Sequence, residues 1–175
     1  LSKKLAADLD ALVLDVKVGT GAFMAAPQDA LALAEALVKT AQGAGCMTSA
    51  LITDMNQPLA RSAGNALEVI EVMEALTDGD MASELMRVTV ALGGEVLALG
   101  GLAADAADGE GRIQRAFASG QAAETFGEMV AELGGPADFV DRWRDRLPAA
   151  KVMVDIHPGE SGYVASIDAR ALGEA

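Results

Sequence analysis

The feature that most constrains the fold is a strand–helix–strand pattern near the start of the chain. Residues 11–18 form a short, nearly continuous apolar run rich in β-branched residues, which is typical of a strand covered on both faces. Residues 28–42 follow Pro27, a favourable first helical residue, and repeat apolar side chains at helical spacing. Residues 48–53 return to strand character. This order predicts a right-handed crossover unit of a parallel or mixed sheet.

Beyond Pro58 the periodicity is helical for most of the chain. The predicted helices cover residues 59–76, 81–99, 110–118, 121–133 and 137–146. We therefore predict an α/β fold in which helices flank a mixed sheet, formed by residues 1–149.

The pattern changes again from Lys151 onwards. Apolar side chains alternate on both sides of a Pro-Gly turn at residues 158 and 159, as expected for a β-hairpin. We predict that residues 150–175 begin a second, β-rich C-terminal domain. Because the chain opens at Leu1 without an initiator methionine and stops within this predicted domain, we expect it to be a fragment.

The charge balance disfavours one class of partner. The 175 residues include 13 Lys and Arg against 26 Asp and Glu, for a net charge of -13. A surface with this excess of carboxylates repels a phosphate backbone, so we expect no nucleic-acid partner.

Residues 88–104 are the most apolar stretch, but Glu95 interrupts them and they carry two Gly-Gly pairs. They fall short of the roughly 20 apolar residues that a membrane-spanning helix needs and predict a buried helix. The only cysteine, Cys46, has no partner for an internal disulfide, which indicates a reducing compartment. We expect a cytoplasmic protein without membrane contact.

Two short segments offer groups for ligand binding. Gly19 and Gly21 follow the first predicted strand, where the ligand crevice of an open α/β sheet lies, although taken alone they favour a plain turn. Phe23 comes just after this loop and either lies against a flat ligand or fills the core. Lys3 and Lys4 are adjacent, so on a helix they point about 100° apart and at most one faces the interior. Taken alone, this pattern predicts two solvated lysines.

The segment around Pro58 is richer in polar groups. Asp54, Asn56 and Gln57 lie at the end of the second predicted strand. On the helix predicted to follow, Glu71 lies on the same side as Ala60, among small apolar residues. Its carboxylate could hold a hard cation together with backbone carbonyls, or it could be a solvated glutamate at the rim.

Four stretches of this sequence closely resemble the pyrimidine-nucleoside phosphorylases, especially the bacterial thymidine enzymes. They are LSKKLAADLDALVLDVKVGTGAFM, ALITDMNQPLARSAGNALEV, AAETFGEMVAELGGPADFV and ESGYVASIDARALG. The resemblance implies an α/β domain of the nucleoside phosphorylase and phosphoribosyltransferase type. It also implies reversible phosphorolysis of thymidine or deoxyuridine to the free base and 2-deoxyribose 1-phosphate.

The resemblance assigns roles to five residues. Lys3, the first lysine of the SKK motif, is implied as the catalytic group that binds the base and stabilises it as a leaving anion, and Phe23 as a residue that lines the base pocket. Backbone oxygens of Leu59 and Ser62 with the carboxylate of Glu71 are implied as a monovalent-cation site, occupied by K⁺. Inorganic phosphate is the implied co-substrate, no organic cofactor is expected, and a homodimer is the implied assembly.

The phosphate-binding segments of the family have no counterpart in these residues, so we expect the chain alone to be inactive. His157 lies in the late hairpin segment, where the family has no catalytic residue, and reads as a solvated turn histidine. Three alternatives remain open: a broad pyrimidine or uridine phosphorylase, an anthranilate phosphoribosyltransferase, and a truncated, non-catalytic remnant.

Overall fold

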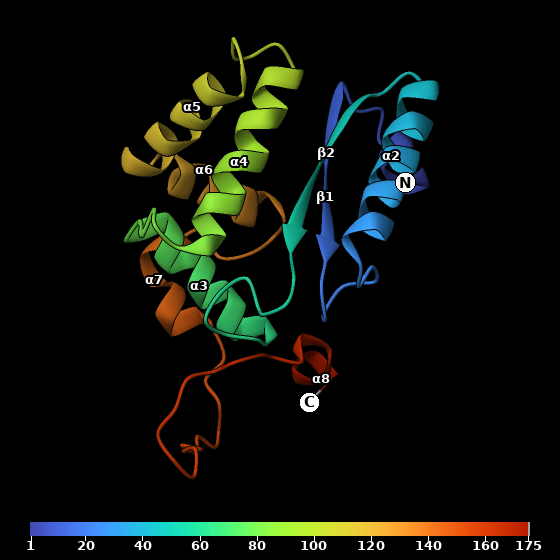
Figure 1. The fold of residues 1–175 in the computed structure, drawn as a ribbon. Coiled ribbons are helices and arrows are strands. Elements are labelled where there is room, and N and C mark those ends of the chain that lie inside the picture. Colours follow the sequence, from blue (N-terminus) through green and yellow to red (C-terminus); the bar gives the residue numbers. More distant parts are fainter. Residues whose placement is uncertain (175) are drawn as a thin grey trace.

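The computed structural model describes residues 1–174, which form an α/β fold of two strands and eight helices (Figure 1). In chain order the elements are α1 (Ser2–Leu5), β1 (Ala11–Val18), α2 (Pro27–Gly43), β2 (Met47–Asp54), α3 (Asn65–Thr77), α4 (Glu84–Leu99), α5 (Ala106–Ala118), α6 (Gln121–Glu132), α7 (Phe139–Arg146) and α8 (Ala169–Glu174). The predicted fold class is confirmed.

The two strands pair in parallel, in a register that runs from Ala11 opposite Met47 to Val18 opposite Asp54. Of the parallel and mixed arrangements that the sequence allowed, the described strands adopt the parallel one. Figure 1 shows α2 and α4 on opposite sides of this sheet, and both helices contact both strands. The two strands therefore end at the same edge of the molecule, where α8 also lies.

The core between α2 and the sheet is built from small and β-branched side chains. Val16 of β1 packs with Ala30 and Ala34 of α2, and all three are buried. Because alanine adds little bulk, the helix axis can approach the strands closely. This packing explains how a chain with only 3% aromatic residues still forms an interior.

The α4–α5 pair is the most extensive helix–helix contact among the described residues and depends on glycine. A Cβ placed on Gly109 would lie only 2.4 Å from the carbonyl oxygen of Gly94 on α4. No real Cβ fits at that separation, so the two backbones touch directly.

Replacing Gly109 with alanine is therefore expected to lower the free energy of unfolding by about 1–3 kcal/mol, since the helices must separate to admit a methyl group. Gly111→Ala on the same helix is the matched control, because its Cβ would meet only the flexible Arg115 guanidinium at 3.3 Å. Denaturant titrations of both variants measure the difference. Equal stability of the two would contradict the close approach.

Asp108 on α5 and Asp138, the residue just before α7, are the only described carboxylates whose pKa clearly departs from its ordinary value. Arg146 of α7 donates two hydrogen bonds to the carboxylate of Asp138, at 2.7 and 2.8 Å, and holds the pKa of Asp138 below its usual value. Arg112 acts on Asp108 of α5 in the same way. Both pairs are at the surface.

The helix after Pro58 begins later than the sequence predicts. Residues 58–64 have no regular structure, and α3 starts at Asn65. Gly64 adopts a φ of +127°, and its N–H donates to the Glu68 carboxylate at 3.1 Å, so the helix N-terminus is fixed there. Ala60 therefore does not share a helix face with Glu71, and that part of the sequence interpretation was wrong.

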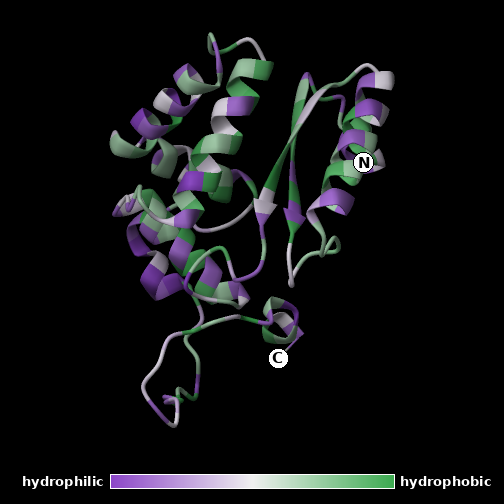
Figure 2. Cartoon of the chain, viewed as in Figure 1, coloured by the Kyte–Doolittle hydropathy of each residue, from purple (hydrophilic) through white to green (hydrophobic). Residues whose placement is uncertain are grey.

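The predicted C-terminal hairpin does not form among the described residues. Residues 152–168 contain no strand, and the apolar side chains that alternate there, such as Val152, Ile156 and Tyr163, are exposed. Figure 2 shows hydrophobic positions along this segment. A two-stranded hairpin is marginal without further strands or a helix to pack on, which accounts for the difference. The proposed domain boundary at residues 149 and 150 stays a prediction.

Two smaller predictions can be compared with the structure. The apolar stretch around residues 88–104 forms most of α4, and no helix among residues 1–174 is long and apolar enough to cross a membrane. Cys46 is buried with a free thiol, whereas His157 is exposed, as predicted.

Candidate functional site

The loop after β1 is closed by its own backbone. The Gly19 N–H donates to the Met24 carbonyl and the Ala22 N–H to the Gly19 carbonyl, both at 3.1 Å. Gly19 has a φ of +129°, which favours glycine. Ala22 is only 4% exposed, whereas the neighbouring Phe23 is 98% exposed. The loop thus projects one aromatic ring into solvent from an anchored backbone.

The loop after β2 is locked to the loop after β1. Asn56 accepts a hydrogen bond from the Thr20 N–H at 3.1 Å, and the Met55 carbonyl accepts one from the Gly21 N–H at 2.9 Å. The Asp54 carboxylate in turn accepts from the side-chain amides of Asn56 and Gln57. The polar residues that the sequence singled out at this strand end therefore organise the loops. A Cβ on Gly19 would lie 2.7 Å from the Asn56 amide, so this contact requires glycine.

A third segment, distant in sequence, joins these two loops. Thr20 donates its hydroxyl to the Ile167 carbonyl at 3.1 Å, and Arg170 of α8 donates to the Ala22 carbonyl at 3.1 Å. Between the loops and residues 164–167 lies a cavity of about 370 Å³ lined by Thr20, Asn56 and Gln57. Figure 1 shows α8 beyond the carboxyl ends of both strands, where open α/β sheets place their ligand crevice.

The three residues implied as a cation site line one cavity. Leu59, Ser62 and Glu71 border a space of about 310 Å³, together with Glu68 and residues of α8. The Ser62 hydroxyl oxygen is buried and has no hydrogen-bond partner among the described residues. The Glu71 side chain is 17% exposed, and the nearest cationic atom recorded for its carboxylate is Arg61 Nε, at 3.9 Å. A buried oxygen without a partner beside a mostly covered carboxylate fits a bound water or cation.

The donor set at this cavity is typical of a weakly charged ion. Among residues 1–174 no donor reaches the carbonyl oxygens of Leu59 or Ser62, so both can accept a cation. The same residues contain no cluster of three or more His, Cys, Asp or Glu that could hold a metal ion. Of the two carboxylates at the cavity, Glu68 accepts a hydrogen bond from the Gly64 N–H. The Glu71 carboxylate with backbone carbonyls suits a monovalent cation such as K⁺, which carbonyl oxygens coordinate in other proteins.

Lys3 and Phe23 are presented by separate parts of the fold. Lys3 is exposed on the short helix α1. The loop that carries Phe23 follows β1 and lies at the carboxyl ends of the strands, whereas α1 precedes the opposite end of β1. Because the Phe23 ring is almost fully exposed, no other described residue covers it. The described residues thus present the two implied base-side groups without enclosing a pocket between them.

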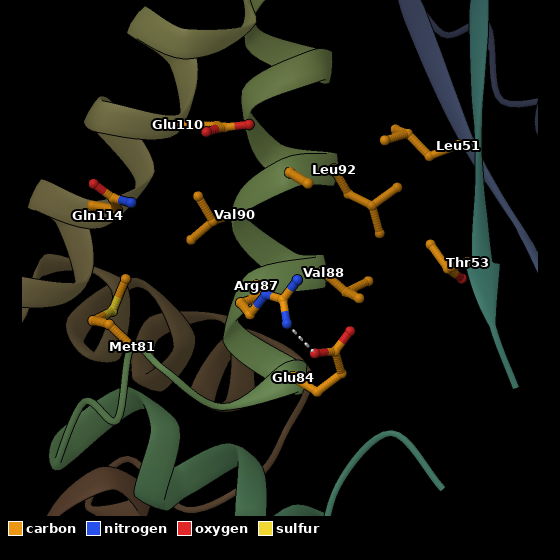
Figure 3. Close-up of a pocket in the computed structure, with 11 residues that line it drawn as sticks. Leu51, Thr53, Met81, Glu84, Arg87, Val88, Val90, Leu92, Glu110 and Gln114 are labelled. Atoms are coloured by element: carbon orange, nitrogen blue, oxygen red, sulfur yellow. Dashed lines mark hydrogen bonds and ion pairs between the residues drawn. The ribbon is translucent and has the colours of Figure 1, made fainter. Parts of the chain in front are cut away.

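A further hollow of about 400 Å³ lies next to α4 and contains none of the sequence-predicted site residues. Figure 3 shows Glu110 and Gln114 on the α5 side of α4 and Leu51 and Thr53 on the strand side, so the hollow spreads around the helix. Two of its three charged residues, Glu84 and Arg87, pair with each other at 2.9 Å. It contains no residue of the loops that follow the two strands and is not our candidate site.

Sequence reasoning missed the contacts made by Thr20, Ile167 and Arg170. In each of these contacts the two partners are separated by about 150 positions, and no sequence periodicity links them. The only available signal was that GTGAFM and SIDARALG both fall inside the motifs that carried the family resemblance.

The fold and the site together define an α/β domain with a glycine-rich loop and an oxygen-lined cavity near the carboxyl ends of parallel strands. Residues 1–123 match the family described as "Glycosyl transferase family, a/b domain". The chain belongs to this glycosyl transferase family.

Within this family, the chain is similar along its whole length to curated thymidine phosphorylases. The thymidine phosphorylase of Burkholderia lata is 51% identical over 175 residues, and that of Sinorhizobium medicae is 50% identical over the same length. Both alignments cover 100% of this chain and 40% of the relative, so the chain spans about 40% of the length of these proteins. The resemblance inferred from the four sequence motifs is confirmed.

Proposed function

We propose that the protein containing this chain catalyses the reversible phosphorolysis of thymidine, or of deoxyuridine, to the free pyrimidine base and 2-deoxyribose 1-phosphate. The observation that carries the proposal is the identity of about half of all positions, along the whole chain, to two thymidine phosphorylases. Family membership supports a transfer reaction at a glycosidic carbon.

The proposed chemistry assigns the base side of the reaction to this chain. Phosphate attacks the sugar carbon while the bond to the base breaks, so negative charge builds on the departing pyrimidine. The Lys3 ammonium, held near a base carbonyl, stabilises that charge, and its contribution grows in the transition state. Phe23 offers a flat apolar surface for the pyrimidine ring. Groups that bind phosphate come from other parts of the full-length protein.

An assay of the full-length protein with phosphate and thymidine, read by thymine release, tests this function. We expect thymidine to be cleaved with a higher kcat/KM than uridine. A preference for uridine would instead favour a broad pyrimidine phosphorylase. No turnover with any pyrimidine nucleoside would favour a non-catalytic role and overturn the proposal.

We also propose that the backbone oxygens of Leu59 and Ser62 and the carboxylate of Glu71 bind a monovalent cation, K⁺ in preference to Na⁺. The unpartnered Ser62 hydroxyl and the mostly covered Glu71 carboxylate in one cavity support this site. A cation there would link the segment after Pro58 to α3, so its role would be to hold the loops at the strand ends in place.

Glu71→Gln in the full-length protein is expected to weaken the dependence of activity and of the melting temperature on K⁺ relative to Na⁺, because the amide has no net charge to offer the ion. Glu128→Gln, an exposed position on α6, is the matched control and should leave the dependence unchanged. Melting temperatures and initial rates in KCl and NaCl at equal ionic strength measure both effects. If the wild type shows no difference between the two salts, the cation assignment fails.

A cytoplasmic homodimer is the assembly and location that we propose for the full-length protein. The family resemblance supports the dimer, and the single buried cysteine with no disulfide suits a reducing compartment.

A further inference from the structure

Residues 167–170, at the start of α8, are hydrogen-bonded to the loop that carries Phe23, and we call this contact the clasp. Three hydrogen bonds join the two: Thr20 Oγ1 donates to the Ile167 carbonyl at 3.1 Å, the Ala169 N–H donates to Thr20 Oγ1 at 3.5 Å, and Arg170 Nη2 donates to the Ala22 carbonyl at 3.1 Å. One hydroxyl thus serves both as donor and as acceptor to the same turn of chain. The two bonds need the hydroxyl hydrogen and the hydroxyl oxygen to point to different groups, so they fix the orientation of the Thr20 side chain.

The close approach is also steric. A Cβ added to Gly21 would lie 2.9 Å from the Ala169 Cβ and 3.1 Å from the Met55 carbonyl oxygen. Any side chain at position 21 would push α8 away from the loop after β1. Gly21 is thus needed for the fit between the loop and α8.

The clasp acts on the immediate neighbour of Phe23. The Ala22 carbonyl, which Arg170 holds, belongs to the peptide group that leads into Phe23. On the other side, Met24 is held by its hydrogen bond with Gly19 and by a parallel bridge to Val18. With both neighbours anchored, the exposed phenyl ring keeps a fixed backbone direction and loses less conformational entropy when a ligand binds.

We propose that Arg170 and Thr20 are positioning residues, which fix the loop at residues 19–24 so that Phe23 is presented to the pyrimidine ring of the nucleoside. The inference rests on the proposed function for its ligand, but the clasp itself is a property of the fold. Arg170 acts through the Ala22 carbonyl and touches neither substrate nor phosphate.

The test uses the full-length protein and the variant Arg170→Met, which keeps an apolar stem of similar reach and removes the donor. Because Phe23 contacts the base in both ground and transition states, we expect KM for thymidine to rise up to about tenfold, the scale of one aromatic contact, while kcat and KM for phosphate change little. Arg170→Lys, which keeps a donor, should restore most of the affinity. Arg142→Met, an exposed arginine on α7, is the control and should match the wild type.

Two readouts separate positioning from general destabilisation. In a Phe23→Ala background, Arg170→Met should raise KM no further, since the ring it positions is gone. Hydrogen exchange of the amides at residues 19–24 should be faster in Arg170→Met than in the wild type. If Arg170→Met does not fold, the variant Thr20→Val is measured in its place in both experiments. This substitution removes the two hydrogen bonds that the Thr20 hydroxyl makes with Ile167 and Ala169.

Unchanged exchange at residues 19–24 would overturn the clasp, whatever the activity. Faster exchange with an unchanged KM, or a further rise of KM in the Phe23→Ala background, would overturn the positioning role. A wild type without thymidine turnover would overturn the proposed function and with it the role toward a nucleoside, whereas the exchange measurement would still decide on the clasp.

Discussion

Replacing Lys3 with alanine in the full-length protein is expected to lower kcat/KM for thymidine by about two to three orders of magnitude. The loss is large because the ammonium meets a charge that exists mainly in the transition state. A charge-stabilising donor aimed at such a group typically contributes a few kcal/mol in a site from which water is excluded. Because the interaction strengthens as the base departs, we expect the loss in kcat rather than only in KM.

Lys4→Ala is the matched control for this experiment. The two lysines are adjacent on α1 and both exposed, so their substitution removes the same charge from the same surface. On a helix they point about 100° apart, and only one can face a bound base. Steady-state kinetics with thymidine at saturating phosphate compare the variants. Equal rates for Lys3→Ala and the wild type would remove Lys3 from the site, and equal losses in both variants would indicate a general effect of charge.

The strand–helix–strand unit could be predicted from the sequence because its signals are local. Pro27 begins α2 as expected, and the apolar run at residues 11–18 coincides with β1. The start of α3 was misplaced, since the apolar periodicity continues upstream of Gly64 while the backbone does not. There the hydrogen bond from Gly64 to Glu68, together with a positive φ, outweighs the helical pattern.

For the candidate site, the sequence signal was the family resemblance, which implied a cation site, and the binding of a cation there stays a prediction. Leu59, Ser62 and Glu71 are close in sequence, and the structure brings them to one cavity. The contact between Arg170 and Ala22 depends on how the end of the chain returns to the strand ends, which no local pattern encodes. The hairpin prediction failed for a related reason. Alternating side chains at residues 152–167 carry a strand signal, but the described residues give those segments no sheet to join.

We expect the 175-residue chain, expressed alone, to show no measurable phosphorolysis of thymidine. The chain spans 40% of the length of its thymidine phosphorylase relatives, and its implied base-side groups, Lys3 and Phe23, are both exposed to solvent. Holding two reactants together in one orientation can supply about 7–11 kcal/mol of a reaction barrier. Because solvent surrounds both the Phe23 ring and the Lys3 ammonium, these groups alone hold neither the nucleoside nor the phosphate in such an orientation.

The purified chain should still fold, because α2 and α4 cover the two faces of the sheet. Both edges of its two-stranded sheet lack a neighbouring strand among the described residues, and apolar side chains at residues 152–164 are exposed, so we also expect self-association. Circular dichroism and light scattering verify folding and association before thymine release is measured at saturating phosphate and thymidine. The full-length protein is the positive control. Turnover by the isolated chain near the full-length rate would mean that these residues bind phosphate themselves, and the assignment of only the base side to this chain would be wrong.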